Sequence, residues 1–240
     1  MGHSTVLIEQ DGVRFLTDPL LRPRVAHLKR HGSTPRPPRD VDVVLISHLH
    51  HDHLHLTSLR ALPNRPRVIV PNGAGEWLGR LAVRADELGA GDSMEVGGVA
   101  IRAVAAEHGS DRRPGGPAAE PLGYVIGTRP SVYFAGDTDV FDSMAELAPV
   151  DVALLPVAGW GPRLGPGHMN AERAARAVEL LRPRVAIPIH WGTFHPTYAR
   201  RGPWFTDPPR EFAAHVEVLA PSVEVRVLEP GESTCVTRTG

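Results

Sequence analysis

The sequence predicts a single layered α/β domain that spans residues 1–240. Short apolar runs rich in β-branched residues recur along the chain and are typical of strands. Segments with a helical spacing of apolar residues lie between them. Gly and Pro, 24 of each, divide the chain into many short elements, and no change of composition marks an interdomain linker. Strands and helices mixed along the whole chain therefore indicate one α/β domain.

The expected strands are the β-branched runs bounded by Gly, Pro and polar residues. They cover residues 5–9, 13–17, 41–47, 68–70, 99–105, 123–127, 131–135, 152–156, 185–188 and 223–228. The run Val43-Val44-Leu45-Ile46 is apolar at every position, which favours a strand that is covered on both faces. Two stretches, 22–40 and 109–121, lack such a pattern and are expected to be loops.

The segment 171–181 is expected to be a helix. Asn170 stands at its N-cap and Pro183 lies just beyond its end. One face of this helix is apolar and carries Ala171, Ala174, Ala175, Val178 and Leu181. A second apolar stripe predicts another helix and consists of Phe212, Val216 and Leu219. Further helices are expected near 56–62, 75–81 and 141–147.

The charge balance and the cysteine count exclude several functions. The 26 basic residues, of which only Lys29 is lysine, face 27 acidic ones, so the net charge is −1 and no nucleic-acid partner is expected. Cys235 is the only cysteine, which excludes an intramolecular disulfide and a cysteine-based zinc site. No apolar run is long enough to span a bilayer, and the N-terminus has no signal-like core. We therefore expect a cytoplasmic protein without stable membrane association.

Histidine is the unusual component, with 13 residues. Residues 48–53 read HLHHDH and directly follow the apolar run that ends at Ser47. Imidazole and carboxylate groups at a strand end can converge on one point, as metal coordination requires. A solvated histidine-rich turn is the alternative, but this tract is internal and follows an apolar strand. Three more candidate ligands follow other apolar runs, namely His108, Asp137 and His190.

These motifs together resemble the metallo-β-lactamase superfamily. Within it, the chain is similar to the branch of N-acylphosphatidylethanolamine phospholipase D-like and ascorbate-6-phosphate lactonase-like hydrolases. The similar segments are GHSTVLIE at 2–9, LTDP at 16–19, HLHHDH at 48–53, FAGDT at 134–138 and IHWGTF at 189–194. The resemblance implies an αββα sandwich, two mixed β-sheets flanked by helices, with the site at one edge. Members of this branch usually have a short strand before the Gly-His element, so the first edge strand is expected to be lost or shortened.

The resemblance also implies two divalent metal ions and assigns their ligands. His48, His50 and His108 would hold one ion, Asp52, His53 and His190 the other, and Asp137 would bridge both. Imidazole and carboxylate donors favour zinc, while manganese and iron are chemically acceptable. A metal-bridging hydroxide would attack a phosphodiester or a lactone or ester-type bond of a small-molecule substrate. Asp52 and Asp137 would orient this nucleophile, and His168 would assist the leaving group.

Further candidate residues surround the predicted ligands. His3 is expected to support a ligand from behind, and Asp18 either does the same or caps its turn. The candidates for substrate contacts are Arg112, Arg113, Trp160 and His195. The alternative function is a non-catalytic metal-binding scaffold or sensor of the same fold, whose signature would be a degenerate ligand set. The sequence leaves a homo-oligomer open.

Overall fold

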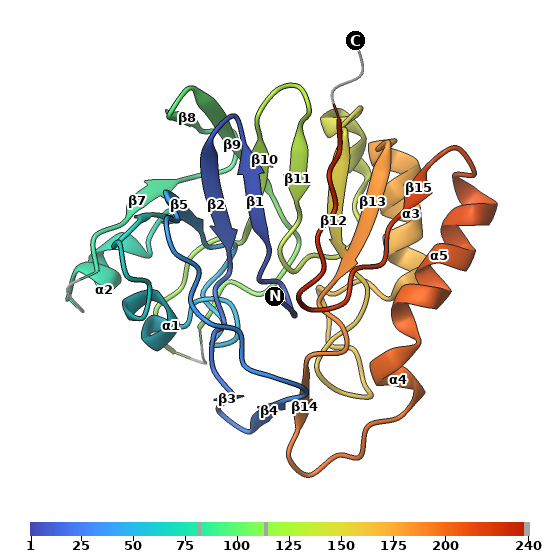
Figure 1. The fold of residues 1–240 in the computed structure, drawn as a ribbon, viewed down its shortest axis with the longest axis horizontal. Helices are drawn as coiled ribbons and strands as arrows, with labels where there is room; N and C mark the ends of the chain where they lie inside the picture. Colours follow the sequence, from blue (N-terminus) through green and yellow to red (C-terminus); the bar gives the residue numbers. More distant parts are fainter. Residues whose placement is uncertain (81–82, 113–114, 238–240) are drawn as a thin grey trace.

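The computed structural model describes residues 1–80, 83–112 and 115–237, which form a sandwich of two mixed β-sheets with helices on both outer sides (Figure 1). One sheet has the order β1-β2-β5-β6-β7, with β1 (Leu7–Gln10), β2 (Val13–Thr17), β5 (Val43–Leu45), β6 (Arg67–Pro71) and β7 (Asp86–Leu88). The other has the order β15-β13-β12-β11-β10-β9-β8. Its strands are β8 (Ser93–Val96), β9 (Val99–Ala105), β10 (Leu122–Ile126), β11 (Val132–Phe134), β12 (Val152–Pro156), β13 (Val185–Ile189) and β15 (Glu224–Val225).

Three apolar clusters hold the layers together. One lies between the two sheets and contains the buried rings of Phe15 and Phe134. The helices α1 (Leu56–Arg60) and α2 (Gly75–Arg80) cover the outer face of the first sheet. The outer face of the second sheet is covered by α3 (Ala171–Leu181), α5 (Pro208–Leu219) and the 3-10 helix η1 (Asp142–Leu147). Among the described residues, no helix combines the length and apolarity needed to cross a membrane.

Most of the expected elements are present. The strands expected at 13–17, 99–105 and 152–156 have those bounds, whereas the last expected strand is only two residues long. The Asn170 side chain caps α3, accepting a hydrogen bond from Arg173 N at 2.9 Å. Of the helix expected over 75–81, residue 81 lies outside the described residues. The expected patterns thus reproduce the layers of the sandwich.

The expectation of a loop over residues 22–40 is wrong in part. β3 (Arg24–Val25) and β4 (Leu28–Arg30) form a hairpin there, and β4 pairs with β14 (Phe194–Pro196) in a small third sheet. These strands have two or three residues, too few for a recognisable alternation. β7, β8 and the short helix α4 (Pro203–Thr206) also lie outside the expected elements.

Parallel strand pairing brings the candidate residues to one edge of the sandwich. β2 runs parallel to β5, and β11, β12 and β13 run parallel to one another. The carboxyl ends of parallel strands meet at the same edge of their sheet. Asp18, His48, Asp137 and His190 each follow one of these strands. The N-terminus, which precedes His3, lies between the two sheets in Figure 1.

Candidate metal centre

The HLHHDH segment forms a tight turn after β5. The backbone N–H groups of His53 and Leu54 both donate to His50 O, at 3.1 and 2.9 Å. Helix α1 begins directly afterwards, where His55 Nδ1 accepts a hydrogen bond from Ser58 N at 3.2 Å. The segment is therefore fixed between a buried strand and a capped helix, which holds its side chains in defined directions.

Three imidazoles form the first cluster, two from this turn and one, His108, from the segment after β9. His50 Nδ1 lies 2.9 Å from His48 Nε2 and 3.0 Å from His108 Nε2. His108 donates from Nδ1 to Gly167 O at 2.7 Å, which leaves a lone pair on its Nε2. His48 Nδ1 lies 2.9 Å from Ser47 Oγ. Burial lowers the pKa of His48 well below its usual value and that of His108 to about 4. Both rings are therefore neutral at pH 7, and each has one nitrogen lone pair that could bind a metal.

The second cluster combines two imidazoles with two carboxylates. Asp137 Oδ2 lies 3.1 Å from His53 Nε2 and 3.2 Å from His190 Nε2. Asp52 Oδ2 lies 3.6 and 4.0 Å from the same two nitrogens. His190 donates from Nδ1 to Ala158 O at 2.8 Å, so its Nε2 carries a lone pair toward the carboxylates. Two carboxylates and two imidazole nitrogens thus converge from three segments of the chain.

Three buried atoms at this meeting point have no hydrogen-bond partner among the described residues. They are His53 Nε2, His190 Nε2 and Asp137 Oδ1. Buried polar atoms are nearly always paired, so a group of this kind requires an explanation. Converging lone pairs of imidazole and carboxylate are the donor set that a divalent cation needs. Each of the two clusters contains a group of side chains that could hold such an ion.

Opposite charges hold the second cluster together in the metal-free protein. Burial alone would raise the pKa of Asp137, but His190 and His53 hold it well below its usual range. Burial likewise opposes a charge on His53, yet the carboxylates of Asp137, Asp52 and Asp18 keep its pKa well above the ordinary value. A proton on His53 therefore balances part of the carboxylate charge, and a bound cation would compete with that proton.

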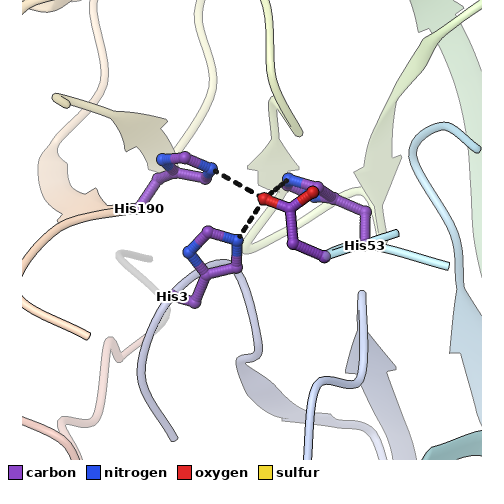
Figure 2. A group of neighbouring side chains, drawn as sticks. His3, His53 and His190 are labelled. Carbon is purple, nitrogen blue, oxygen red and sulfur yellow. Dashed lines mark hydrogen bonds and ion pairs between the residues drawn. The ribbon is translucent and has the colours of Figure 1, made fainter. Parts of the chain in front are cut away.

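His3 and Asp18 contact the predicted ligands, and both also belong to candidate metal-binding groups, His3 with Asp52, His53 and His190, and Asp18 with His48 and His53. His3 Nε2 lies 3.1 Å from Asp52 Oδ2, and Figure 2 shows its ring beside those of His53 and His190 around a carboxylate. Burial lowers the pKa of His3 to about 3. Asp18 Oδ2 accepts hydrogen bonds from His53 Nδ1 at 2.7 Å and Ser47 Oγ at 2.6 Å, and its Oδ1 accepts one from Ser47 N at 2.8 Å. Contacts of this kind fix the tautomer and orientation of a metal-binding histidine.

His168 faces the same centre from the solvent side. Its Nε2 lies 3.3 Å from Asp137 Oδ2, and its Nδ1 lies 3.0 Å from Pro166 O. Its side chain is 17% exposed, whereas those of His53 and His190 are 0% exposed. Burial opposes a charge on His168, but the hydrogen bond to Asp137 raises its pKa above the usual value. The His168 side chain therefore lies between the buried centre and solvent.

Arg112 contacts the protein itself at this site. Its Nη1 donates to Leu49 O within the HLHHDH segment at 2.6 Å, and to Leu54 O just after that segment at 3.0 Å. Its guanidinium carbon lies 4.9 Å from the centroid of the Trp77 ring. The geometry therefore makes Arg112 a brace of the histidine-rich turn. Arg113 lies outside the described residues.

Trp160 and His195 lie apart from the two clusters. The ring of Trp160 packs against the cluster formed by the third sheet, with its centroid 5.1 Å from that of His27. His195 belongs to β14, and its Nδ1 lies 3.0 Å from Pro196 O. Neither residue belongs to a potential metal-binding group among the described residues.

Sequence reasoning missed several groups that support the centre. Ser47 links Asp18 to His48, and Thr193 Oγ1 accepts a hydrogen bond from His3 N at 2.7 Å. Ser47 directly precedes the HLHHDH segment and Thr193 lies within IHWGTF, so proximity to a motif was the available signal. The carbonyls that hold His108 and His190 carry no sequence signal, because every residue has one.

Comparison with known proteins defines the class. Residues 13–191 match the family described as Beta-lactamase superfamily domain, and the chain belongs to the metallo-β-lactamase superfamily. Within it, the chain belongs with the UPF0173 metal-dependent hydrolases. One of these, from Methanopyrus kandleri, is 36% identical over 241 residues, which cover 97% of this chain and 96% of that protein.

Two further proteins support membership of the metallo-β-lactamase superfamily. N-acyl-phosphatidylethanolamine-hydrolyzing phospholipase D 1 from Caenorhabditis elegans is 32% identical over 224 residues, 81% of this chain and 63% of that protein. The solved structure of Igni18, a metallo hydrolase from Ignicoccus hospitalis, has a TM-score of 0.71 at 27% identity and covers 96% of this chain and 94% of that one. The expected αββα metallo-β-lactamase fold is thus confirmed.

Proposed function

We propose that this protein uses two divalent metal ions to hydrolyse a phosphodiester or a lactone or ester-type bond of a small molecule. The observation that supports this most directly is a set of three buried atoms that have no hydrogen-bond partner in the described part of the chain, His53 Nε2, His190 Nε2 and Asp137 Oδ1. A structural zinc site is closed by four ligands, whereas this donor set is large enough for two ions. The site is also accessible to solvent at the partly exposed His168 side chain.

In this proposal the metal ligands are those that the sequence predicts. His48, His50 and His108 would hold one ion and Asp52, His53 and His190 the other, and Asp137 lies close enough to both sets to contribute to either. When bound, two such ions supply Lewis acidity and lower the pKa of water toward neutrality. Mixed imidazole and carboxylate donors favour zinc, and manganese or iron also suit them.

The side chains of the protein orient the nucleophile and move the proton. The carboxylates of Asp52 and Asp137 orient the attacking water, and the His3 ring holds Asp52 in place at 3.1 Å. Asp137 raises the pKa of His168, which favours a proton on Nε2. His168 then donates this proton to the oxygen of the leaving group and regains one from solvent.

Phosphodiesters are the first substrates to test, because the nematode relative is named as a phospholipase D. Metal analysis is combined with turnover of bis-p-nitrophenyl phosphate and a panel of lactones. We expect about two metals per chain. Activity should disappear in His48→Ala and Asp137→Ala and persist in His215→Ala, which alters an exposed histidine of α5.

Two outcomes decide against this proposal. Less than one bound metal per chain, or activity that survives both substitutions, would refute the dinuclear hydrolase. A protein that binds two metals but turns over no substrate of either class would instead support the scaffold or sensor alternative.

A further inference from the structure

The third sheet, β3–β4–β14, has two chemically different faces. One face packs into a buried apolar cluster with Val25, Leu28 and Phe194. On the other face, the register places Arg24 opposite Lys29 on β4, and Lys29 opposite His195 on β14. Directly opposed residues of antiparallel strands share a face. A row of basic side chains therefore crosses the outer face of this sheet, and it includes the only lysine of the chain.

A hollow of about 530 Å³ adjoins the β14 end of this row. Its lining includes His31, His195, Arg200, Arg201 and Phe205. The Phe205 ring is buried, with the Arg201 guanidinium carbon 5.8 Å from its centroid and the rings of His31 and His195 edge-on at 5.7 and 5.8 Å. Arg201 Nη1 also lies 2.9 Å from His31 Nε2. Nitrogen-bearing side chains thus gather around one aromatic ring.

The positive charge of this hollow has no counter-charge in the described part of the chain. No carboxylate lines it, and neither Arg200 nor Arg201 forms an ion pair there. Other exposed arginines do pair, such as Arg67 with Asp86 at 2.6 Å. Like charges that face one another across strands are destabilising. A bound anion would relieve this repulsion.

We propose that the basic face of β3–β4–β14 and its hollow bind a small oxyanion, a phosphate or carboxylate group of a small molecule, apart from the candidate metal centre. A guanidinium offers paired N–H donors that match such groups. Successive residues of a strand point to opposite sides, and the Phe194 ring lies 5.5 Å from that of His3. His195 and the hollow are therefore on the far side of β14 from the centre.

A small anion fits this surface better than a nucleic acid or a lipid bilayer. The basic side chains occupy one three-stranded sheet and the loop beside it, with the hollow at the β14 end. Figure 1 shows β3, β4 and β14 together at the lower end of the molecule. The chain as a whole has a net charge of −1, which gives no extended positive field to hold a polyanion.

The hollow and the metal centre share one stretch of chain. His31 N donates to Thr193 O at 2.7 Å, and Thr193 Oγ1 accepts from His3 N at 2.7 Å. An anion held by His31 and His195 would restrain the stretch that begins at His190.

Calorimetric titration of the metal-free protein with inorganic phosphate, at constant ionic strength, tests the proposal. Because metal is removed, a failure here is independent of the proposed hydrolysis. Wild-type protein is expected to bind phosphate saturably, and Arg201→Gln and Lys29→Gln to bind it roughly tenfold or more weakly. Arg176→Gln, an exposed arginine of α3, should bind as the wild type does.

NMR signals of the His31 and His195 ring protons locate the bound anion. Phosphate should shift them in the wild type and not in Arg201→Gln, and a parallel titration with acetate separates carboxylate from phosphate recognition. The proposal is overturned if neither anion binds saturably, or if Arg201→Gln binds as tightly as the wild type. Binding only to anionic phospholipid vesicles or to an oligonucleotide, with neither small anion bound, also overturns it.

Discussion

Asp18→Asn should weaken metal binding although it leaves every predicted ligand in place. Asp18 is fully buried and accepts hydrogen bonds from His53 Nδ1 at 2.7 Å, from Ser47 Oγ at 2.6 Å and from Ser47 N at 2.8 Å. An amide has a single oxygen, so one of the two acceptor positions becomes a donor. In either orientation of the amide, its NH₂ group faces an N–H of Ser47 or of His53.

The size of the effect follows from these two orientations. An NH₂ that faces Ser47 N leaves a buried donor unpaired, which costs about 1–3 kcal/mol. An NH₂ that faces His53 favours the tautomer with its proton on Nε2, the atom that lies 3.1 Å from Asp137 Oδ2. A nitrogen that carries a proton cannot coordinate a metal. The orientation that faces His53 predicts roughly 10–100-fold weaker metal binding, as for other groups that orient metal-binding histidines, and the orientation that faces Ser47 N predicts a loss of stability.

Competition with a chromogenic zinc chelator measures this affinity, and thermal unfolding of the metal-free protein measures stability separately. Asp42→Asn is the matched control, because Asp42 is exposed and accepts a hydrogen bond from Arg14 N at 2.8 Å. We expect Asp18→Asn to lower metal affinity and stability, and Asp42→Asn to alter stability alone. An affinity of Asp18→Asn within about twofold of the wild type would show that Asp18 does not orient His53 for metal.

Three further predictions concern the same centre. Arg112→Gln removes hydrogen bonds to Leu49 O, Leu54 O and His51 Nδ1, so the chelator assay should show roughly tenfold weaker metal binding. An equal effect in Arg176→Gln would contradict the bracing role. His168→Gln should lower kcat about 10²–10⁴-fold at unchanged metal content, whereas loss of metal would make His168 a ligand. Because its pKa is well above the ordinary value, His53 is protonated in the metal-free protein at neutral pH. Metal binding should then release a proton and tighten as pH rises, and calorimetry in buffers of different ionisation enthalpy would show no proton release if this is wrong.

The convergence of the candidate donor residues was predictable because metal coordination uses few residue types. His48, His108 and His190 each follow an apolar run that is a strand or directly continues one, and strand pairing brings them to one edge. The N-cap of α3 was predictable for the same reason, since Asn170 is one of the few residue types that can accept from a first-turn N–H. Features that only a few residue types can provide, such as metal ligands and helix N-caps, can therefore be predicted from the sequence.

The missed features depend on contacts between distant parts of the chain. β4 pairs with β14 across more than half of the sequence, and neither strand is long enough to show a pattern of its own. Arg112 follows His108 closely, which suggested a substrate clamp, and its contacts with the carbonyls of Leu49 and Leu54 had no signal in the sequence. A flexible cation can satisfy a carboxylate, a phosphate or a backbone carbonyl, so its residue type alone does not decide among them.

Three residues at the centre combine an unfavourable backbone conformation with a side chain that the centre uses. His3, Asp18 and His190 have positive φ angles of 58°, 34° and 61°. Such a conformation costs a non-glycine residue of order 1–3 kcal/mol. Exposed residues with positive φ, such as Asp11 and Asp40, lie at surface positions where glycine would remove that cost without loss of a buried contact. At the three buried positions glycine would also delete the side chain that faces the centre. His and Asp tolerate this region better than β-branched residues do, so these positions require residues that both adopt the left-handed backbone and carry a donor.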